Sequence, residues 1–183
     1  MPILVLDDIL TVDFCNHMID WFESNPDKYD GFVGGHDTFG SFRKIDHKIK
    51  KSIDADIKSP DDKHVLHNAY GNCMRQYRNY CDYLPVHNMY PSPFRVRRYN
   101  EGDYYNWHTD YEINNRGVRT ATILHYLNDT IGGETEFTDG TIVEPKVGRS
   151  LIFPAHWTVP HRGKTPTEGS KYIITCFVYN KLK

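Results

Sequence analysis

The spacing of hydrophobic residues changes near the middle of the chain. Up to about residue 93 they recur every three or four positions, which predicts helices, and from Phe94 onward they alternate in short β-branched runs, which predicts strands. Turn residues such as Gly132-Gly133 and Asp139-Gly140 separate these runs. The pattern predicts an α+β protein in which a helical half precedes a β core.

Two segments of the first half carry a helical pattern. After a short strand in "ILVLDDIL", Thr11 can cap a helix that ends near Pro26. A second helix is expected from about residue 60 to residue 83, and the glycine-rich residues 30–45 are expected to form a loop. The first helix should bury one apolar face, formed by Phe14, Met18, Trp21 and Phe22.

The second half contains many short strand-like runs at close spacing. They include "FRVRRY", "RTATILHYL", "ETEFT", "RSLIFP" and "KYIITCFVY", and such a series is typical of a β-sandwich or barrel. The length suits one domain with its own core. We therefore expect a single domain over residues 1–183, with residues 1–93 as mainly helical support and residues 94–183 as the β core.

Charge and cysteine content argue against several classes of protein. Lys plus Arg (22) nearly balances Asp plus Glu (24), so the net charge of −2 favours neither a nucleic-acid nor a membrane partner. No apolar run approaches the roughly 20 residues of a membrane span, and the N-terminus lacks the basic start of a secretory signal. We expect a soluble, cytoplasmic protein, and the sequence leaves its oligomeric state open. Without a C-x-x-C pair, free buried thiols are expected at Cys15, Cys73, Cys81 and Cys176.

A His-x-Asp pair stands in the aromatic stretch "YYNWHTDYE". Because side chains alternate along a strand, His108 and Asp110 lie on one face and can converge on a metal ion. Trp107 alternates with them and should point away from the metal into packing. Such a pair occurs often by chance, so a third ligand is needed, and the downstream candidates are His125, His156 and His161.

A basic residue favours one of these three histidines. Lys171 stands ten residues past His161, at the start of an apolar strand-like run, where a buried ammonium requires an anionic partner. Two histidines and one carboxylate on one face of an ion are typical of non-haem Fe(II) oxygenases. The same set can hold zinc, and a zinc hydrolase would then need a base such as Glu112 or Glu134.

Several motifs together resemble a known family. They are "RRYNEGDYYNWHTD", "TILHYLN", "GGETEF", "VEPKVGRSLIFP" and "GSKYIITCFVY", and they span roughly residues 94–183. These motifs resemble the 2-oxoglutarate- and Fe(II)-dependent dioxygenases of the prolyl 4-hydroxylase type. The resemblance implies a double-stranded β-helix core (jelly-roll, cupin-like) with N-terminal supporting helices.

The resemblance also implies roles for individual residues. The iron ligands would be His108, Asp110 and His161. The distal carboxylate of 2-oxoglutarate would be bound by Lys171 and Tyr126, in a pocket lined by Tyr99 and Thr175. The peptide substrate would lie near Tyr105, Arg119 and Phe177, the last of which replaces the tryptophan that prolyl hydroxylases usually have there.

The activity implied by the resemblance is oxidation of a C–H bond. Fe(II), 2-oxoglutarate and O2 would be required, with ascorbate as an optional reductant, and succinate and CO2 would be coproducts. We expect a prolyl residue in a peptide or protein as the target. Two alternatives stay open: the same chemistry on a lysyl side chain, a free amino acid or a nucleobase, and a non-catalytic cupin-like metal-binding module.

Overall fold

A computed structural model describes residues 1–37, 40–84 and 88–181 of the chain. The helices are α1 (Val12–Ser24) and α2 (Pro60–Tyr80). The strands are β1 (Leu4–Leu6), β2 (Tyr29–Asp30), β3 (Val33–Asp37), β4 (Gly40–Lys44), β5 (Ile53–Asp56), β6 (Met89–Pro91), β7 (Arg95–Tyr99), β8 (Tyr105–His108), β9 (Ile113–Asn114), β10 (Gly117–Tyr126), β11 (Ile131–Gly132), β12 (Thr135–Phe137), β13 (Ile142–Val143), β14 (Ser150–Pro154), β15 (His161–Gly163), β16 (Pro166–Glu168) and β17 (Lys171–Asn180).

Both predicted helices are present, with side-chain caps at their first turns. The Thr11 hydroxyl accepts a hydrogen bond from the Phe14 backbone N–H at 3.2 Å, and Ser59 caps α2 in the same way through Asp62. Pro60 opens α2, where the backbone donor that proline lacks has no partner inside the helix. These local signals explain why the helix starts could be predicted from the sequence.

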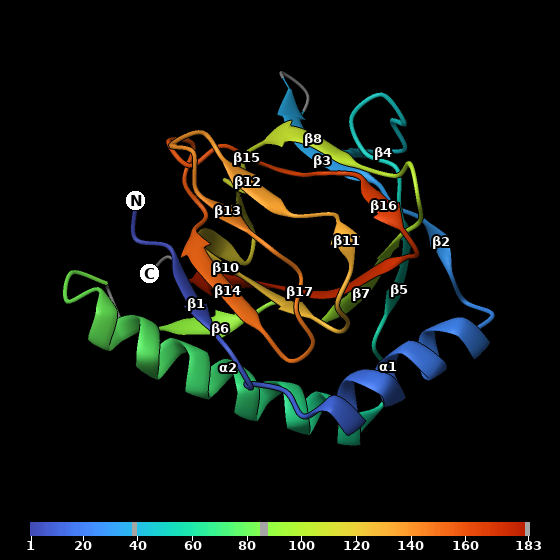
Figure 1. Cartoon of the computed structure of the whole chain (residues 1–183). Helices are drawn as coiled ribbons and strands as arrows, with labels where there is room; N and C mark the ends of the chain where they lie inside the picture. Colours follow the sequence, from blue (N-terminus) through green and yellow to red (C-terminus); the bar gives the residue numbers. More distant parts are fainter. Residues whose placement is uncertain (38–39, 85–87, 182–183) are drawn as a thin grey trace.

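Two sheets form the β core. The main sheet has nine strands in the path β1-β14-β10-β17-β7-β5-β2, with β6 on β17 and β9 on β10. The smaller sheet has four strands in the order β13-β12-β15-β8. Figure 1 shows the helices along one side of the main sheet and the smaller sheet on its other side. The predicted α+β fold with a double-stranded β-helix core is confirmed.

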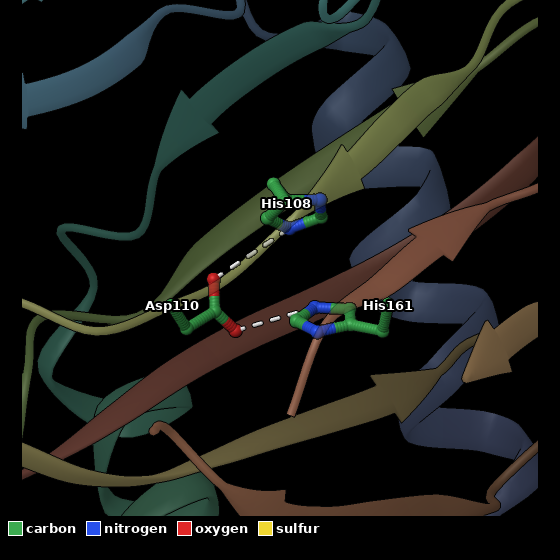
Figure 2. Close-up of side chains that lie close together, drawn as sticks. All are labelled: His108, Asp110 and His161. Carbon is green, nitrogen blue, oxygen red and sulfur yellow. Dashed lines mark ion pairs between the residues drawn. The ribbon is translucent and has the colours of Figure 1, made fainter. Parts of the chain in front are cut away.

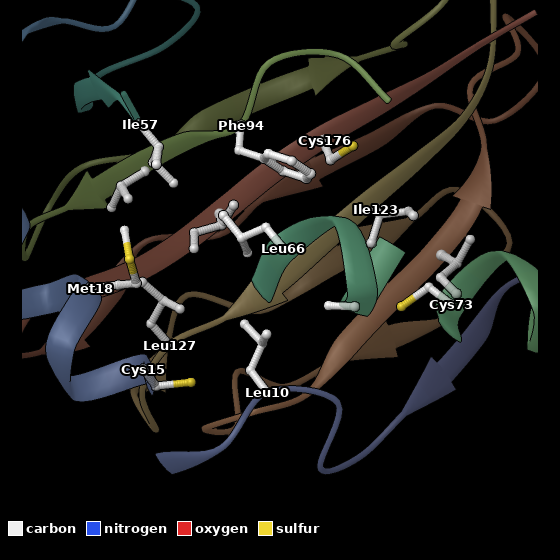
Figure 3. Close-up of a cluster of buried hydrophobic side chains, with 14 of the residues drawn as sticks. Leu10, Cys15, Met18, Ile57, Leu66, Cys73, Phe94, Ile123, Leu127 and Cys176 are labelled. Carbon is white, nitrogen blue, oxygen red and sulfur yellow. The ribbon is translucent and has the colours of Figure 1, made fainter. Parts of the chain in front are cut away.

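Side chains of the main sheet point alternately to its two faces, and each face contributes to a separate hydrophobic core. On β17, Ile174 and Cys176 pack against the helices, whereas Lys171, Ile173 and Thr175 alternate with them and face the smaller sheet. Figure 3 shows the helix-side core, where residues from α1, α2 and the main sheet meet. The pocket side of the main sheet is thus supported from behind by an apolar layer.

The half expected to be mainly helical support, residues 1–93, also contains strands. Its described residues form six strands besides the two helices, and β5 pairs with β7 in the main sheet. The expected loop at residues 30–45 contains β3 and β4, which form an antiparallel pair from Val33–Lys44 to Asp37–Gly40, with residues 38–39 outside the described part. Backbone pairing of neighbouring segments needs no alternating apolar pattern, so the hydrophobic spacing did not predict these strands.

The cysteines are free, as predicted. Cys15, Cys73 and Cys176 are buried, and Cys81 is half-buried, so the expectation of burial is correct for three of the four. Neither helix in the described part of the chain is both long and apolar enough to cross a membrane.

Candidate active site

Two neighbouring strands of the smaller sheet bring the three predicted ligands together. His108 ends β8, Asp110 follows two residues later, and His161 begins β15. The strands are antiparallel, and the pairing register sets His161 directly opposite His108. The pairing of β8 with β15 therefore brings His161 next to His108 and Asp110, although His161 lies about 50 residues later in the sequence (Figure 2).

The three side chains form a compact cluster. His108 Nε2 lies 3.7 Å from Asp110 Oδ1, and His161 Nε2 lies 3.5 Å from Asp110 Oδ2. One nitrogen or oxygen atom from each residue lies within 4.8 Å of the other two. Among the described residues, no other three His, Cys, Asp or Glu side chains bring ligand atoms this close.

Backbone carbonyls orient both imidazole rings. His108 Nδ1 donates to the carbonyl of Asn106 at 2.8 Å, and His161 Nδ1 donates to the carbonyl of Val159 at 3.2 Å. A proton on Nδ1 leaves the lone pair of Nε2 free in each ring, and both Nε2 atoms face Asp110. This is the tautomer that a metal ligand needs, and such outer hydrogen bonds commonly orient metal-binding histidines.

The protonation states also suit a metal site. Burial and the neighbouring His161 lower the pKa of His108 to about 3, which keeps the ring neutral. Burial alone would raise the pKa of Asp110, but His161, His108 and a hydrogen bond from Thr122 outweigh it and lower that pKa. A neutral imidazole beside an ionised carboxylate is the state in which both groups bind metal ions.

Thr122 supports Asp110 and was missed by the sequence analysis. Its hydroxyl donates to Asp110 Oδ2 at 2.7 Å, and both side chains are buried. Thr122 lies on β10 in the main sheet, so this bond joins the two sheets at the cluster. Thr122 stands four residues before Tyr126, so both side chains lie on the same face of β10. This spacing is the sequence signal from which Thr122 could have been predicted.

The donor set fits a first-row metal ion. It offers two imidazole nitrogens and one carboxylate oxygen, and all three residues line one pocket. The pocket is lined by Arg97, Tyr99, Tyr105, His108, Asp110, Leu124, Thr135, His161, Gly163, Lys171, Ile173 and Thr175.

Lys171 is a buried cation in this pocket. It is 2 % exposed, and no carboxylate among the described residues lies within ion-pair distance of it. Its Nζ donates to the carbonyl of Gly133 at 2.7 Å and lies 4.8 Å from the centre of the Tyr99 ring. Burial lowers the pKa of Lys171 to about 8, partly offset by Glu134. A buried ammonium with one carbonyl partner is suited to binding an anion.

Glycine makes the approach of Lys171 to the loop possible. Gly133 has a φ of +73°, and a Cβ at this position would lie 3.2 Å from Lys171 Cδ. A side chain there would be strained by the backbone conformation and would crowd the lysine stem. The "GGETEF" turn thus contributes both a hydrogen-bond acceptor and the space that Lys171 occupies.

The other predicted cosubstrate residues occupy different positions. Thr175 lines the pocket, and its hydroxyl is buried without a hydrogen-bond partner in the described part of the chain. Tyr99 lines the pocket opposite Lys171 in the strand register. The Tyr126 hydroxyl shares a 2.7 Å hydrogen bond with Thr135, and it is Thr135 that lines the pocket.

The predicted substrate residues separate into two groups. Tyr105 lines the pocket and stacks on His108, with the ring centres 3.5 Å apart. Arg119 is engaged elsewhere: it forms an ion pair with Glu112, and its guanidinium lies 3.8 Å from the centre of the Phe177 ring. Neither Arg119 nor Phe177 lines the pocket.

The other candidate histidines lie away from the cluster. His125 is fully buried on the helix side of β10, where its Nδ1 lies 2.6 Å from the Ser150 hydroxyl. His156 bonds to Thr158 at 2.8 Å and packs against Trp157. Neither belongs to the three-residue group.

The expectation that Trp107 points into packing is wrong. It points away from the cluster, but its side chain is 44 % exposed, and the Arg162 guanidinium lies 4.9 Å from the ring centre.

A protein-family model matches the segment that carries these residues. The 2OG-Fe(II) oxygenase superfamily matches residues 94–179, the segment that contains every predicted site residue. No curated protein matches the chain by sequence. Residues 94–179 belong to this superfamily, and the chain is a 2-oxoglutarate-dependent dioxygenase with a prolyl hydroxylase-like fold.

Solved structures show the same fold over nearly the whole chain. The viral collagen prolyl hydroxylase of Paramecium bursaria Chlorella virus-1 is similar at a TM-score of 0.72 and 19% identity, with 97% of this chain and 96% of that chain covered. A Trichoplax adhaerens prolyl hydroxylase in complex with a hypoxia-inducible factor peptide fragment gives 0.71 and 18%, covering 98% and 84%. A Pseudomonas putida prolyl-4-hydroxylase gives 0.66 and 17%, covering 99% and 94%.

Proposed function

We propose that the protein hydroxylates a prolyl residue in a peptide or protein, with succinate and CO2 as coproducts. The observation that carries this proposal is a pocket that joins the His108, Asp110 and His161 cluster to the buried cation of Lys171. Such a pocket offers a metal site at one end and a carboxylate-binding residue within the same enclosure.

In this proposal, His108, Asp110 and His161 hold Fe(II). The carbonyls of Asn106 and Val159 keep Nε2 of each histidine unprotonated and aimed at the ion. Thr122 holds Asp110 in its ionised form through the 2.7 Å hydrogen bond. When bound, Fe(II) with 2-oxoglutarate and O2 supplies the oxidising power that inserts one oxygen atom into an unactivated C–H bond.

Lys171 binds the distal carboxylate of 2-oxoglutarate. Its ammonium can exchange part of its contact with Gly133 for a charge-assisted hydrogen bond, and carboxylate binding offsets the cost of burying the cation. Thr175 supplies a buried hydroxyl that has no other partner in the described residues. Tyr99 lines the same space, and Tyr126 supports it through Thr135.

The peptide reaches the metal along an aromatic surface. Tyr105 stacks on His108 inside the pocket. Tyr111, next to Asp110, and Trp157, four residues before His161, are exposed. Extended proline-containing peptides are commonly recognised by aromatic side chains. Arg119 and Phe177 act from outside the pocket lining, and Arg119 also donates to the Asp110 carbonyl at 3.4 Å.

The proposal is tested by incubating the protein with Fe(II), 2-oxoglutarate, ascorbate and proline-containing peptides. We expect succinate to form in proportion to peptide product that has gained the mass of one oxygen atom. Fragmentation should locate that oxygen on a prolyl residue. Succinate formation that no peptide stimulates, or oxygen found on a lysyl residue instead, would contradict the proposed substrate.

The zinc hydrolase alternative lacks a positioned base. Glu112 forms an ion pair with Arg119, and Glu134 lies 3.5 Å from Lys164. Neither glutamate lines the pocket beside the cluster. The geometry therefore favours oxidation over hydrolysis.

A further inference from the structure

A buried cluster of charges adjoins the pocket and has no role in the proposed binding of iron or 2-oxoglutarate. It consists of Lys50, Asp54 and Arg97, and the first two are fully buried. Asp54 on β5 pairs in register with Arg97 on β7. Of the three, Arg97 lines the pocket, together with Tyr99 and Tyr105.

The carboxylate of Asp54 is satisfied by residues other than Arg97. Its Oδ1 accepts a hydrogen bond of 2.7 Å from Ser52, and its Oδ2 accepts one of 3.0 Å from Lys50. Arg97 Nε lies farther away, at 3.5 Å from Oδ2, and has no hydrogen-bond partner among the described residues. Arg97 is thus the looser partner and retains hydrogen-bonding capacity.

Gly31 packs against the cluster at Ser52, Lys50 and Asp54. A Cβ at Gly31 would lie 2.1 Å from Ser52 Oγ and 2.7 Å from Lys50 Nζ, so the backbone of residue 31 is already in close contact with these groups. The side on which Arg97 can take a further partner is the pocket that it lines.

The cluster places two basic groups beside one carboxylate. Burial and the neighbouring Arg97 lower the pKa of Lys50 to about 7. Burial opposes the charge of Arg97 as well, but Asp54 outweighs it and raises the pKa of the guanidinium, which stays charged. Arg97 therefore stays a buried cation even where Lys50 loses its proton, and a carboxylate on its pocket side could pair with it.

We propose that Arg97 binds a carboxylate of the primary substrate, so that the enzyme acts on an acidic substrate. This inference rests on the proposed function, in which the metal and Lys171 take the two carboxylates of 2-oxoglutarate. The planar guanidinium of Arg97 suits a carboxylate, which it can bind through two parallel hydrogen bonds. The carboxylate belongs to an Asp or Glu next to the target prolyl residue, or to a free amino acid.

Matched probes test this inference. Peptides that carry Glu or Gln beside proline, and L-proline with L-prolinamide, are titrated calorimetrically into protein loaded with Fe(II) and 2-oxoglutarate without oxygen. We expect either the Glu peptide or L-proline to bind at least about 30-fold more tightly than its matched amide. Arg97→Gln should abolish this preference while the KM for 2-oxoglutarate changes less than about twofold.

Arg98→Gln is the matched control. Arg98 stands next to Arg97 on β7, but it faces the helices and forms an ion pair with Glu23 at 2.9 Å. This variant should keep the preference for the acidic probe. Melting curves of both variants show whether the fold is retained, and because Lys50 and Ser52 still satisfy Asp54, we expect Arg97→Gln to fold.

The outcomes separate this inference from the proposed function. If acidic probes bind no better than their amides, or if Arg97→Gln keeps the preference, the role of Arg97 is overturned. If Arg97→Gln instead raises the KM for 2-oxoglutarate, Arg97 binds the cosubstrate and the inference is also overturned. An Arg97-dependent preference for acidic probes, without hydroxylation of any prolyl peptide, would support Arg97 and contradict the prolyl target.

Discussion

At the scale of single residues, the candidate site depends on a few hydrogen bonds that select protonation states. Two backbone carbonyls hold the imidazole tautomers, and Thr122 donates a hydrogen bond that favours the ionised carboxylate of Asp110 together with His161 and His108. Lys171 differs from these groups because its pKa, about 8, lies close to physiological pH. Its charge is therefore the part of the site that pH can change most readily.

The affinity for 2-oxoglutarate should fall as pH rises through about 8, because binding then requires Lys171 to take up a proton. We expect Kd to rise by up to about tenfold per pH unit above that value, measured by calorimetry without oxygen. Lys171→Arg, which stays charged, should show no such rise over the same range. A pH-independent Kd in the unaltered protein would contradict the role of Lys171.

The same shift predicts how the stability of the unliganded protein depends on pH. The pKa of Lys171 is lowered from 10.5 to about 8, so between these values the unfolded chain binds more protons than the folded protein. The contribution of Lys171 to the free energy of unfolding should therefore rise with pH in this window. Urea unfolding at several pH values should show a smaller rise for Lys171→Met, and an equal rise would contradict the lowered pKa.

At the scale of secondary-structure elements, the sequence predicted what depends on local spacing. The helix caps, the His-x-Asp pair and the alternation along β17 all follow from residues close together in the chain. The register of β8 against β15 depends on long-range pairing, which the local pattern does not encode. The position of Arg97 beside Asp54 was not predicted for the same reason. Asp54 lies on β5, in the half of the chain that was predicted to be mainly helical.

The helix α2 should contribute to stability through its buried face. Leu66 is fully buried in the core between α2 and the main sheet, so Leu66→Ala should lower the free energy of unfolding by about 2–5 kcal/mol. Its neighbour Val65 is 38 % exposed, and Val65→Ala is the matched control, with an expected change below about 1 kcal/mol. Equal losses in urea unfolding would contradict this packing.

At the scale of the whole molecule, the second half of the chain lines the pocket, and the first half packs against it. Residues 94–179 supply the candidate metal ligands and Lys171, while β5 and the residues before it bring Lys50 and Asp54 against the pocket residue Arg97. The helices support the main sheet from its other side (Figure 1). The N-terminal half therefore supports the main sheet and supplies the charged partners of Arg97.

The most direct test of the assigned centre is the conversion of 2-oxoglutarate to succinate by single variants under Fe(II) and O2. Asp110→Ala and His161→Ala should lose this conversion and also bind less than one Fe(II) per chain, because each removes a ligand from the cluster. His156→Ala, which changes a histidine outside the cluster, should retain both properties. An active His161→Ala together with an inactive His156→Ala would contradict the assignment.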